Sequence, residues 1–168
     1  MADLVNVRGL SDLQRMLDTL PAKLEQNVMR SALRAGANIV KEEAQTLLAS
    51  NGNVKTAVLS KGLKVSTRAK AGVVTASIKA KGKHGYIAHW IEFTGAAPHI
   101  IKGKKGKALT FAGGVYQAIN HPGFKAKPFM RPAMDGKAGA ALVAVGEAIK
   151  KRLTKEGLDV SDVEIDEV

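Results

Sequence analysis

Four histidines are the side chains best suited to metal binding or proton transfer in this sequence: His84, His89, His99 and His121. Their spacing fits no common zinc pattern, and no His-x-x-x-His pair places two ligands on one face of a helix. The chain has no cysteine, which excludes thiolate ligands, a thiol nucleophile and a disulfide framework. We therefore expect neither a metal nor a cofactor.

The sequence also lacks the motifs of a nucleophilic serine site and of a phosphate-binding loop. Serine, histidine and aspartate are present, but no Gly-x-Ser-x-Gly segment occurs and acids are sparse in the middle of the chain. The segment from Gly103 to Lys107 has the glycines and lysines of a phosphate loop without its required spacing. A hydrolase would need a carboxylate or histidine constellation that is not found. The sequence thus predicts a protein that is not an enzyme.

Charge is distributed unevenly along the chain. The net charge is +11, and between Lys61 and Lys107 there are eleven basic residues against one acid, Glu92. From Glu156 to the end there are six acids and no base. Opposite charges on two regions of one chain suit head-to-tail contacts between identical copies.

A glycine- and lysine-rich loop is expected from 96 to 106, with the apolar pair Ile100 and Ile101 inside it. Loops of this kind often become ordered on a partner. Its candidate contacts to DNA or to a partner are Lys102, Lys104, Lys105 and Lys107. A basic DNA-binding protein of the nucleoid type is the alternative function, since the isoelectric point is about 10.0. The acidic end and the lack of a recognisable reading helix argue against it.

A chain of 168 residues fits one domain with a core of its own. We divide it into a domain at 1–155 and an acidic tail at 156–168, which adds a strand to a neighbour or remains disordered. No apolar run is long enough for a membrane span and no secretory signal is visible, so we expect a soluble intracellular protein with no membrane contact.

Three helices are expected. A short one follows Ser11, and a long one at 22–49 carries the apolar stripe Leu24, Val28, Ala32, Ala35, Ile39 and Leu47. The third, at 133–153, presents Leu142, Val145, Ile149 and Leu153 to a sheet. Its glycines suggest either a close approach of another helix or a helix that is completed only on assembly.

The sheet is expected from alternating segments at 61–68 and 72–80, joined by a turn at 69–72, with a further short strand at 109–111. The segment 86–95 is either a strand or a helical turn. The predicted fold class is α+β, with a small antiparallel sheet packed by a long N-terminal helix and a C-terminal helix.

Three short segments occur in a characteristic order: Tyr86 to Gly95, the expected turn from His121 to Phe124, and Lys127 to Met134. With them the chain resembles the tail-component, or neck, proteins of the head-tail joining modules of long-tailed phages and prophages. The shared features are an aromatic-hydrophobic-Glu-x-x-Gly segment, a His-Pro-Gly turn and a Pro-Phe-hydrophobic-Arg-Pro-Ala entry into a last helix. The resemblance covers most of residues 10–153.

The resemblance implies a structural virion protein that forms a ring in the neck or at the head-proximal end of the tail. Its partners would be other copies of itself, in a ring expected to be hexameric, head-closure or connector proteins, and tail-terminator or tail-tube proteins. Contact with genome DNA in the lumen of the ring is a further expectation.

The motifs supply the residues expected to pack or to form subunit interfaces: Trp90, Glu92, Gly95, Pro122, Gly123, Pro128, Phe129, Arg131 and Pro132. Among these, Phe129 and Trp90 are the predicted packing anchors, because buried aromatic side chains dominate core and interface energies. We also predict that the side chains of Arg131 and Glu92 form a charge-assisted pair that joins two motifs.

Overall fold

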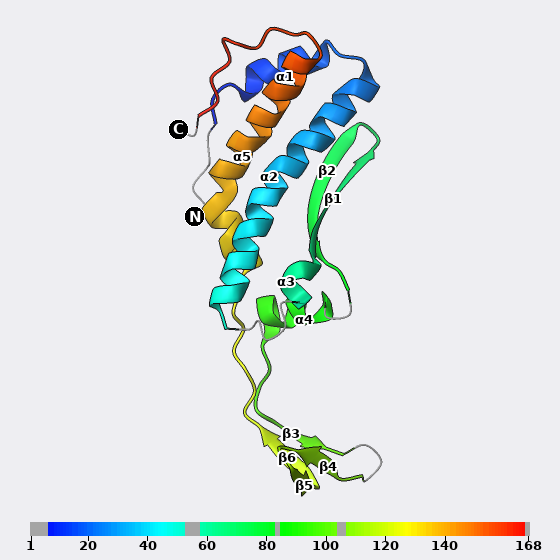
Figure 1. Cartoon of the computed structure of the whole chain (residues 1–168), viewed down its shortest axis with the longest axis vertical. Helices are drawn as coiled ribbons and strands as arrows, with labels where there is room; N and C mark the ends of the chain where they lie inside the picture. Colours follow the sequence, from blue (N-terminus) through cyan, green and yellow to red (C-terminus); the bar gives the residue numbers. More distant parts are fainter. Residues whose placement is uncertain (1–6, 53–57, 83–84, 104–106, 167–168) are drawn as a thin grey trace.

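The computed structural model describes residues 7–52, 58–82, 85–103 and 107–166. It consists of a helical body and a narrow arm that projects from one end of it (Figure 1). The long elements of the body are α1 (Leu10–Asp18), α2 (Ala22–Ser50), β1 (Leu63–Lys70), β2 (Val73–Ala80) and α5 (Met130–Lys155). The fold class is α+β, as the sequence predicts, with all the sheets two-stranded and antiparallel.

Helix α2 forms the centre of the body and confirms the helix expected at 22–49. It ends at Ser50 with Asn51 as its C-cap, and Gly52 follows with a φ of 69°. Its fully buried face is an i, i+4 stripe: Val28, Ala32, Gly36, Val40, Ala44 and Leu48. The predicted stripe is therefore partly wrong, because Ala35, Ile39 and Leu47 are only half-buried.

Gly36 explains why the buried face of α2 differs from the predicted stripe. A Cβ at Gly36 would lie 2.6 Å from the carbonyl oxygen of Ala141 and 2.6 Å from a methyl group of Val145, both on α5. The missing side chain lets the two helices approach closely here. A hydrophobicity pattern does not count glycine as an apolar residue and so misses the contact.

The prediction that α5 packs on the sheet is wrong. Helix α5 packs along α2, and the β1–β2 hairpin covers another flank of α2 (Figure 1). In the hairpin, Val65 pairs with Ile78 and Thr67 with Ala76, while Lys64 and Lys79 pair on the outer, exposed face.

The hairpin turn confirms the predicted position at 69–72. Ala71 and Gly72 both have positive φ, 50° and 80°. Two consecutive residues with positive φ form the type of two-residue turn that matches the twist of paired strands.

The C-terminal segment packs on the body. Val160, Val163 and Ile165 are buried in a core with α1, α2 and α5. The backbone N–H of Arg8 donates to the carbonyl of Asp166 at 3.1 Å, and a Cβ at Gly146 would lie 2.8 Å from Ile165. The expectation of a disordered or strand-donating tail is therefore wrong for its described part, residues 156–166.

A second core lies at the other end of the body, beside α3 (Val58–Gly62), α4 (Gly85–His89) and the π-helical turn η1 (Trp90–Thr94). This core consists of Val40, Ala44, Leu48, Leu63, Ile91, Phe129 and Ala133. Of the two alternatives left open for 86–95, the helical one is correct.

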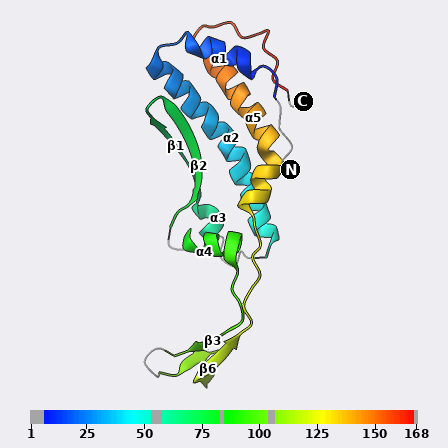
Figure 2. The ribbon, with the colours of Figure 1, turned by 180° about the vertical axis from the view of Figure 1, so that it is seen from behind.

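The arm, which we define as residues 95–128, consists of two long crossing segments with small sheets at the tip (Figures 1 and 2). Strand β3 (His99–Lys102) pairs with β6 (Ala118–His121), and β4 (Leu109–Phe111) pairs with β5 (Gly114–Tyr116). The strand expected at 109–111 is confirmed. The loop expected from 96 to 106 is wrong where β3 occupies it, and the His121 to Phe124 segment is extended rather than a turn.

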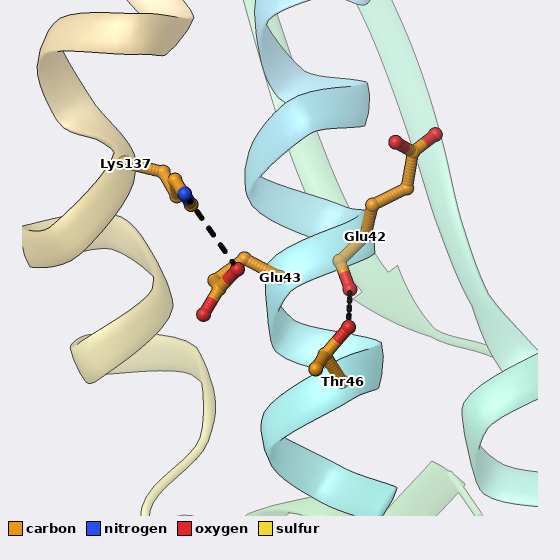
Figure 3. Close-up of polar contacts among 4 residues, drawn as sticks. All are labelled: Glu42, Glu43, Thr46 and Lys137. Atoms are coloured by element: carbon orange, nitrogen blue, oxygen red, sulfur yellow. Dashed lines mark hydrogen bonds and ion pairs between the residues drawn. The ribbon is translucent and has the colours of Figure 1, made fainter.

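The described residues form two ion pairs, and both are at the surface. Arg15 pairs with Asp12 at 3.6 Å, and Lys137 of α5 pairs with Glu43 of α2 at 4.0 Å (Figure 3). Exposed pairs of this kind contribute about 0–1 kcal/mol, so the two apolar cores hold the body together. No described helix is both long and apolar enough to cross a bilayer.

Candidate assembly site

The carboxylate of Glu92 joins two of the sequence motifs. Its side chain is the one charged side chain that is buried among the described residues, with 5% exposed. Oε2 accepts hydrogen bonds from the backbone N–H groups of Phe129 and Met130 at 2.8 and 2.9 Å, and Oε1 accepts one from Arg131 at 3.0 Å. Glu92 thus caps the N-terminus of α5 from a turn that is 37 residues earlier in the chain.

Every backbone donor in the first turn of α5 is accounted for. The first N–H groups of a helix have no partner within the helix. Three of them donate to Glu92, Pro132 has no N–H, and Ala133 donates to the carbonyl of Phe129 at 3.3 Å. The negative carboxylate also lies at the positive end of the helix dipole. The Glu of the first motif and the Pro-Phe-Met-Arg-Pro of the third are therefore two halves of one cap.

The two predicted aromatic anchors differ. Phe129 has no exposed surface and packs in the second core. Trp90 is 48% exposed and packs edge-on against the ring of Tyr86, with centroids 5.3 Å apart. As a core anchor Trp90 is wrong, and its role at a subunit interface stays a prediction.

Arg131 meets Glu92 through its backbone. No ion pair between these two side chains occurs among the described residues. The guanidinium lies over the ring of Phe93 instead, 4.7 Å from its centroid. The predicted link between the motifs is therefore present, but its donor is the Arg131 N–H rather than the guanidinium.

Gly95 and Gly123 let the two segments at the base of the arm approach each other. Ala96 and Phe124 exchange two backbone hydrogen bonds of 2.8 Å. A Cβ at Gly95 would lie 2.5 Å from the carbonyl oxygen of Phe124, and one at Gly123 would lie 2.2 Å from that of Ala96. Both glycines also have positive φ, so larger residues at these positions are excluded by conformation and by space.

The three predicted prolines are exposed around this base. Pro122 lies in the segment that returns from the tip, and Pro128 directly precedes the buried Phe129. The side-chain amide of Asn51, at the end of α2, donates to the carbonyl groups of Lys127 and Pro128 at 3.3 and 3.4 Å. Prolines here stiffen the chain where it passes from arm to body.

The tip of the arm exposes apolar side chains. Of the arm residues whose exposure is described, Gly95 alone is buried, while Ile100, Val115 and Tyr116 are 60%, 73% and 46% exposed. The apolar pair at Ile100 and Ile101 is visible in the sequence, but Val115 and Tyr116 were missed. Nothing in their local pattern distinguishes an exposed short strand from a buried one.

The charged residues predicted for this region lie at the same tip. Lys102 ends β3 and Lys107 precedes β4, and both are exposed. Lys104 and Lys105 lie outside the described residues. All fifteen acids of the chain lie outside the arm, so the arm is uniformly basic.

The body carries an open apolar groove of about 440 Å³ between α2, β2 and α5. Small residues such as Gly36 and Ala138 line it, and Met134 and Leu142 on α5 are exposed at it. The hairpin and α5 cover different flanks of α2, and the groove lies between them. Of the residues predicted to face a sheet on α5, Leu142 and Val145 line this groove, whereas Ile149 and Leu153 are buried in the core with α1 and the C-terminal segment.

Histidines approach each other once in the described chain. The rings of His99 and His121, on paired strands, have centroids 4.9 Å apart. His84 lies outside the described residues. Among the residues that are described, no group of three or more metal-binding side chains occurs.

The cap, the base of the arm and the apolar tip together have the features of a subunit that docks on others. Residues 11–93 match the HK97-gp10-like family. The family model is described as Bacteriophage HK97-gp10, putative tail-component, and it covers just under half of the chain. The resemblance to a phage tail-component family is thereby confirmed for residues 11–93. Searches of curated proteins and of solved structures gave no match.

The HK97-gp10-like match contains α1, α2, the hairpin and Glu92. It ends before the arm and before α5. For the motifs from His121 onward, the resemblance stays a prediction from the sequence, and the Glu92 cap is the physical reason that the matched and unmatched parts go together.

Proposed function

We propose that this chain is a structural virion protein of a long-tailed phage or prophage. It forms a ring in the neck or at the head-proximal end of the tail and helps to join the tail to the head. Its partners are other copies of itself, a head-closure or connector protein and a tail-terminator or tail-tube protein. It acts by binding rather than by catalysis.

The observation that carries this proposal is the arm. Two-stranded sheets are at best marginally stable in water without a further surface to pack on. The arm has such sheets, and Val115, Tyr116 and Ile100 at its tip are exposed. Large exposed apolar patches in folded proteins mark interaction sites. The arm is thus suited to packing on the next copy, and a repeated contact of this head-to-tail kind closes into a ring when the rotation permits.

The proposal is tested in phage particles that lack this protein. We expect filled heads and complete tails that remain separate in electron micrographs. Wild-type protein should restore joining, whereas a variant with Val115→Asp and Tyr116→Asp should not. Tails that attach normally to filled heads without the protein would contradict the proposal.

A DNA-binding function is the second candidate, favoured by the outer face of the hairpin. Lys64 lies directly opposite Lys79 there, Arg68 is exposed nearby, and neither strand contains an acid. Contact with genome DNA in the ring lumen would use the same charges. Affinity for random duplex DNA measured across a salt series tests both, because a true binder weakens steeply as salt rises.

A further inference from the structure

Three arginines line one pocket of the body. Arg30 and Arg34 of α2 and Arg152 of α5 surround a recess of about 490 Å³, together with Asn27, Ser31 and Thr67. All six side chains can donate hydrogen bonds. Arg30 and Arg34 are exposed, and Thr67 of β1 and Arg152 at the end of α5 complete the recess beside them.

The pocket holds positive charge without a matching negative one. None of the ion pairs found among the described residues includes any of the three arginines. Arg34 donates to the hydroxyl of Thr67 at 3.3 Å. The Nε of Arg152 is buried and has no hydrogen-bond partner in the described chain. A buried donor without a partner and three like charges in one recess both destabilise the isolated subunit.

We propose that this pocket binds carboxylates from the acidic C-terminal segment of a neighbouring copy. Arginine side chains match carboxylates with paired, charge-assisted hydrogen bonds. The chain supplies such carboxylates at its surface: Asp162, Glu164 and Asp166 are exposed, while Val163 and Ile165 between them are buried. The buried residues hold the segment in place and leave its acids on the outside.

The segment of the same copy is on the wrong side to fill the pocket. Thr67 places the pocket beside β1, whereas the C-terminal segment runs along the side of α5 away from the hairpin (Figures 1 and 2). A second copy can present its segment to the pocket in a head-to-tail contact. Side-chain carboxylates also enter a recess more readily than the phosphates of a rigid DNA duplex.

This inference rests on the proposed self-assembly, and mixed disulfide formation tests it separately. The natural chain has no cysteine, so a Ser31→Cys variant and a Ser161→Cys variant each carry one thiol and keep every charge. Mixing the two under mild oxidation should give a disulfide dimer of unlike chains. The matched control replaces Ser31→Cys by Ser66→Cys, on the outer face of the hairpin, and should give at least several-fold less.

Charge reversal supplies the second measurement. The variant with Arg30→Glu and Arg34→Glu should associate at least roughly 30-fold more weakly, as judged by native mass spectrometry. Adding Glu164→Lys and Asp166→Lys should restore part of the association. Arg68→Glu, exposed and outside the pocket, is the control for charge alone.

The outcomes separate the two proposals. If the wild-type chain assembles but gives no preferred mixed disulfide and tolerates the double reversal, the pocket inference is wrong and the ring remains. If duplex DNA, rather than the second copy, protects the thiol at position 31 from alkylation, the inference is also wrong. A wild-type chain that never assembles, alone or with tail partners, overturns both.

Discussion

The body and the arm are built on different principles. The body buries apolar side chains in two cores, one of which includes Val160, Val163 and Ile165 of the C-terminal segment. The arm buries only a glycine at its base among the residues whose exposure is described, and it presents apolar side chains to solvent. The difference suggests that the body folds by itself and that the arm gains its stability from other molecules. Glu92, Gly95 and Gly123 lie where the arm joins the body.

The largest expected effect on stability comes from removing one aromatic side chain in the body, compared with removing one in the arm. Phe129→Ala removes a fully buried ring and should lower the free energy of unfolding by about 3–5 kcal/mol. Tyr116→Ala, in the arm, should change it by less than about 0.5 kcal/mol. Urea unfolding followed by circular dichroism measures both. Equal losses in the two variants would contradict the division into body and arm.

The cap at the junction should give the next largest effect. Glu92→Ala leaves three backbone N–H groups at the start of α5 without their acceptor, and we expect a loss of about 2–3 kcal/mol. Glu92→Gln keeps one acceptor oxygen and should lose less. The control is Glu42→Ala, since that exposed side chain makes no contact with α5 in Figure 3. Equal stability of Glu92→Ala and this control would show that the cap does not stabilise α5.

The base of the arm should respond more weakly and locally. Gly123→Ala introduces a Cβ 2.2 Å from the carbonyl oxygen of Ala96 at a φ of +76°, a strain of about 1–3 kcal/mol. Amide exchange at Ala96 and Phe124 should accelerate while exchange in α2 is unchanged. Gly136→Ala is the matched control: it lies in α5 with open space around it and should stabilise by about 1 kcal/mol. Unchanged exchange at Ala96 in the Gly123 variant would show that the segments need not approach so closely.

The smallest effect on stability should accompany a complete loss of assembly. The variant with Val115→Asp and Tyr116→Asp changes exposed residues and should unfold within about 0.5 kcal/mol of wild type. Native mass spectrometry should nevertheless show only monomers where the wild type forms larger species. Normal assembly of this variant would show that the arm tip is not part of the subunit interface.

Much of the body could be predicted from the sequence, because its helices repeat apolar residues over several turns. The extent of α2 and the positions of β1 and β2 follow from such periods. In the arm only the strand at 109–111 could be predicted, since the arm strands have three or four residues and their side chains are not buried in a core that would impose a regular pattern. The sequence identifies the motif residues but not how they contact each other. It predicts that the side chains of Glu92 and Arg131 pair, whereas in the structure the backbone N–H of Arg131 donates to Glu92.

The sequence pattern does not predict the order in which the elements of the body pack. At its contact with α5, helix α2 has Gly36 where a hydrophobic pattern would need an apolar side chain. The pattern therefore does not show this contact, and it predicts that α5 packs on the sheet instead. The acidic tail was misjudged for a similar reason. Its charge suggested disorder, but Val163 and Ile165 alternate with the acids and are buried in a core.

Hydrogen exchange of the arm, in dilute chain and in assembled particles, tests the central claim most directly. The amides of β3 and β6 should exchange within seconds in the dilute monomer while those of α2 remain protected, and assembly should protect the arm by at least roughly a hundredfold. Arm amides that are already as protected as α2 in the monomer, or that stay unprotected in the assembled tail, would contradict the account.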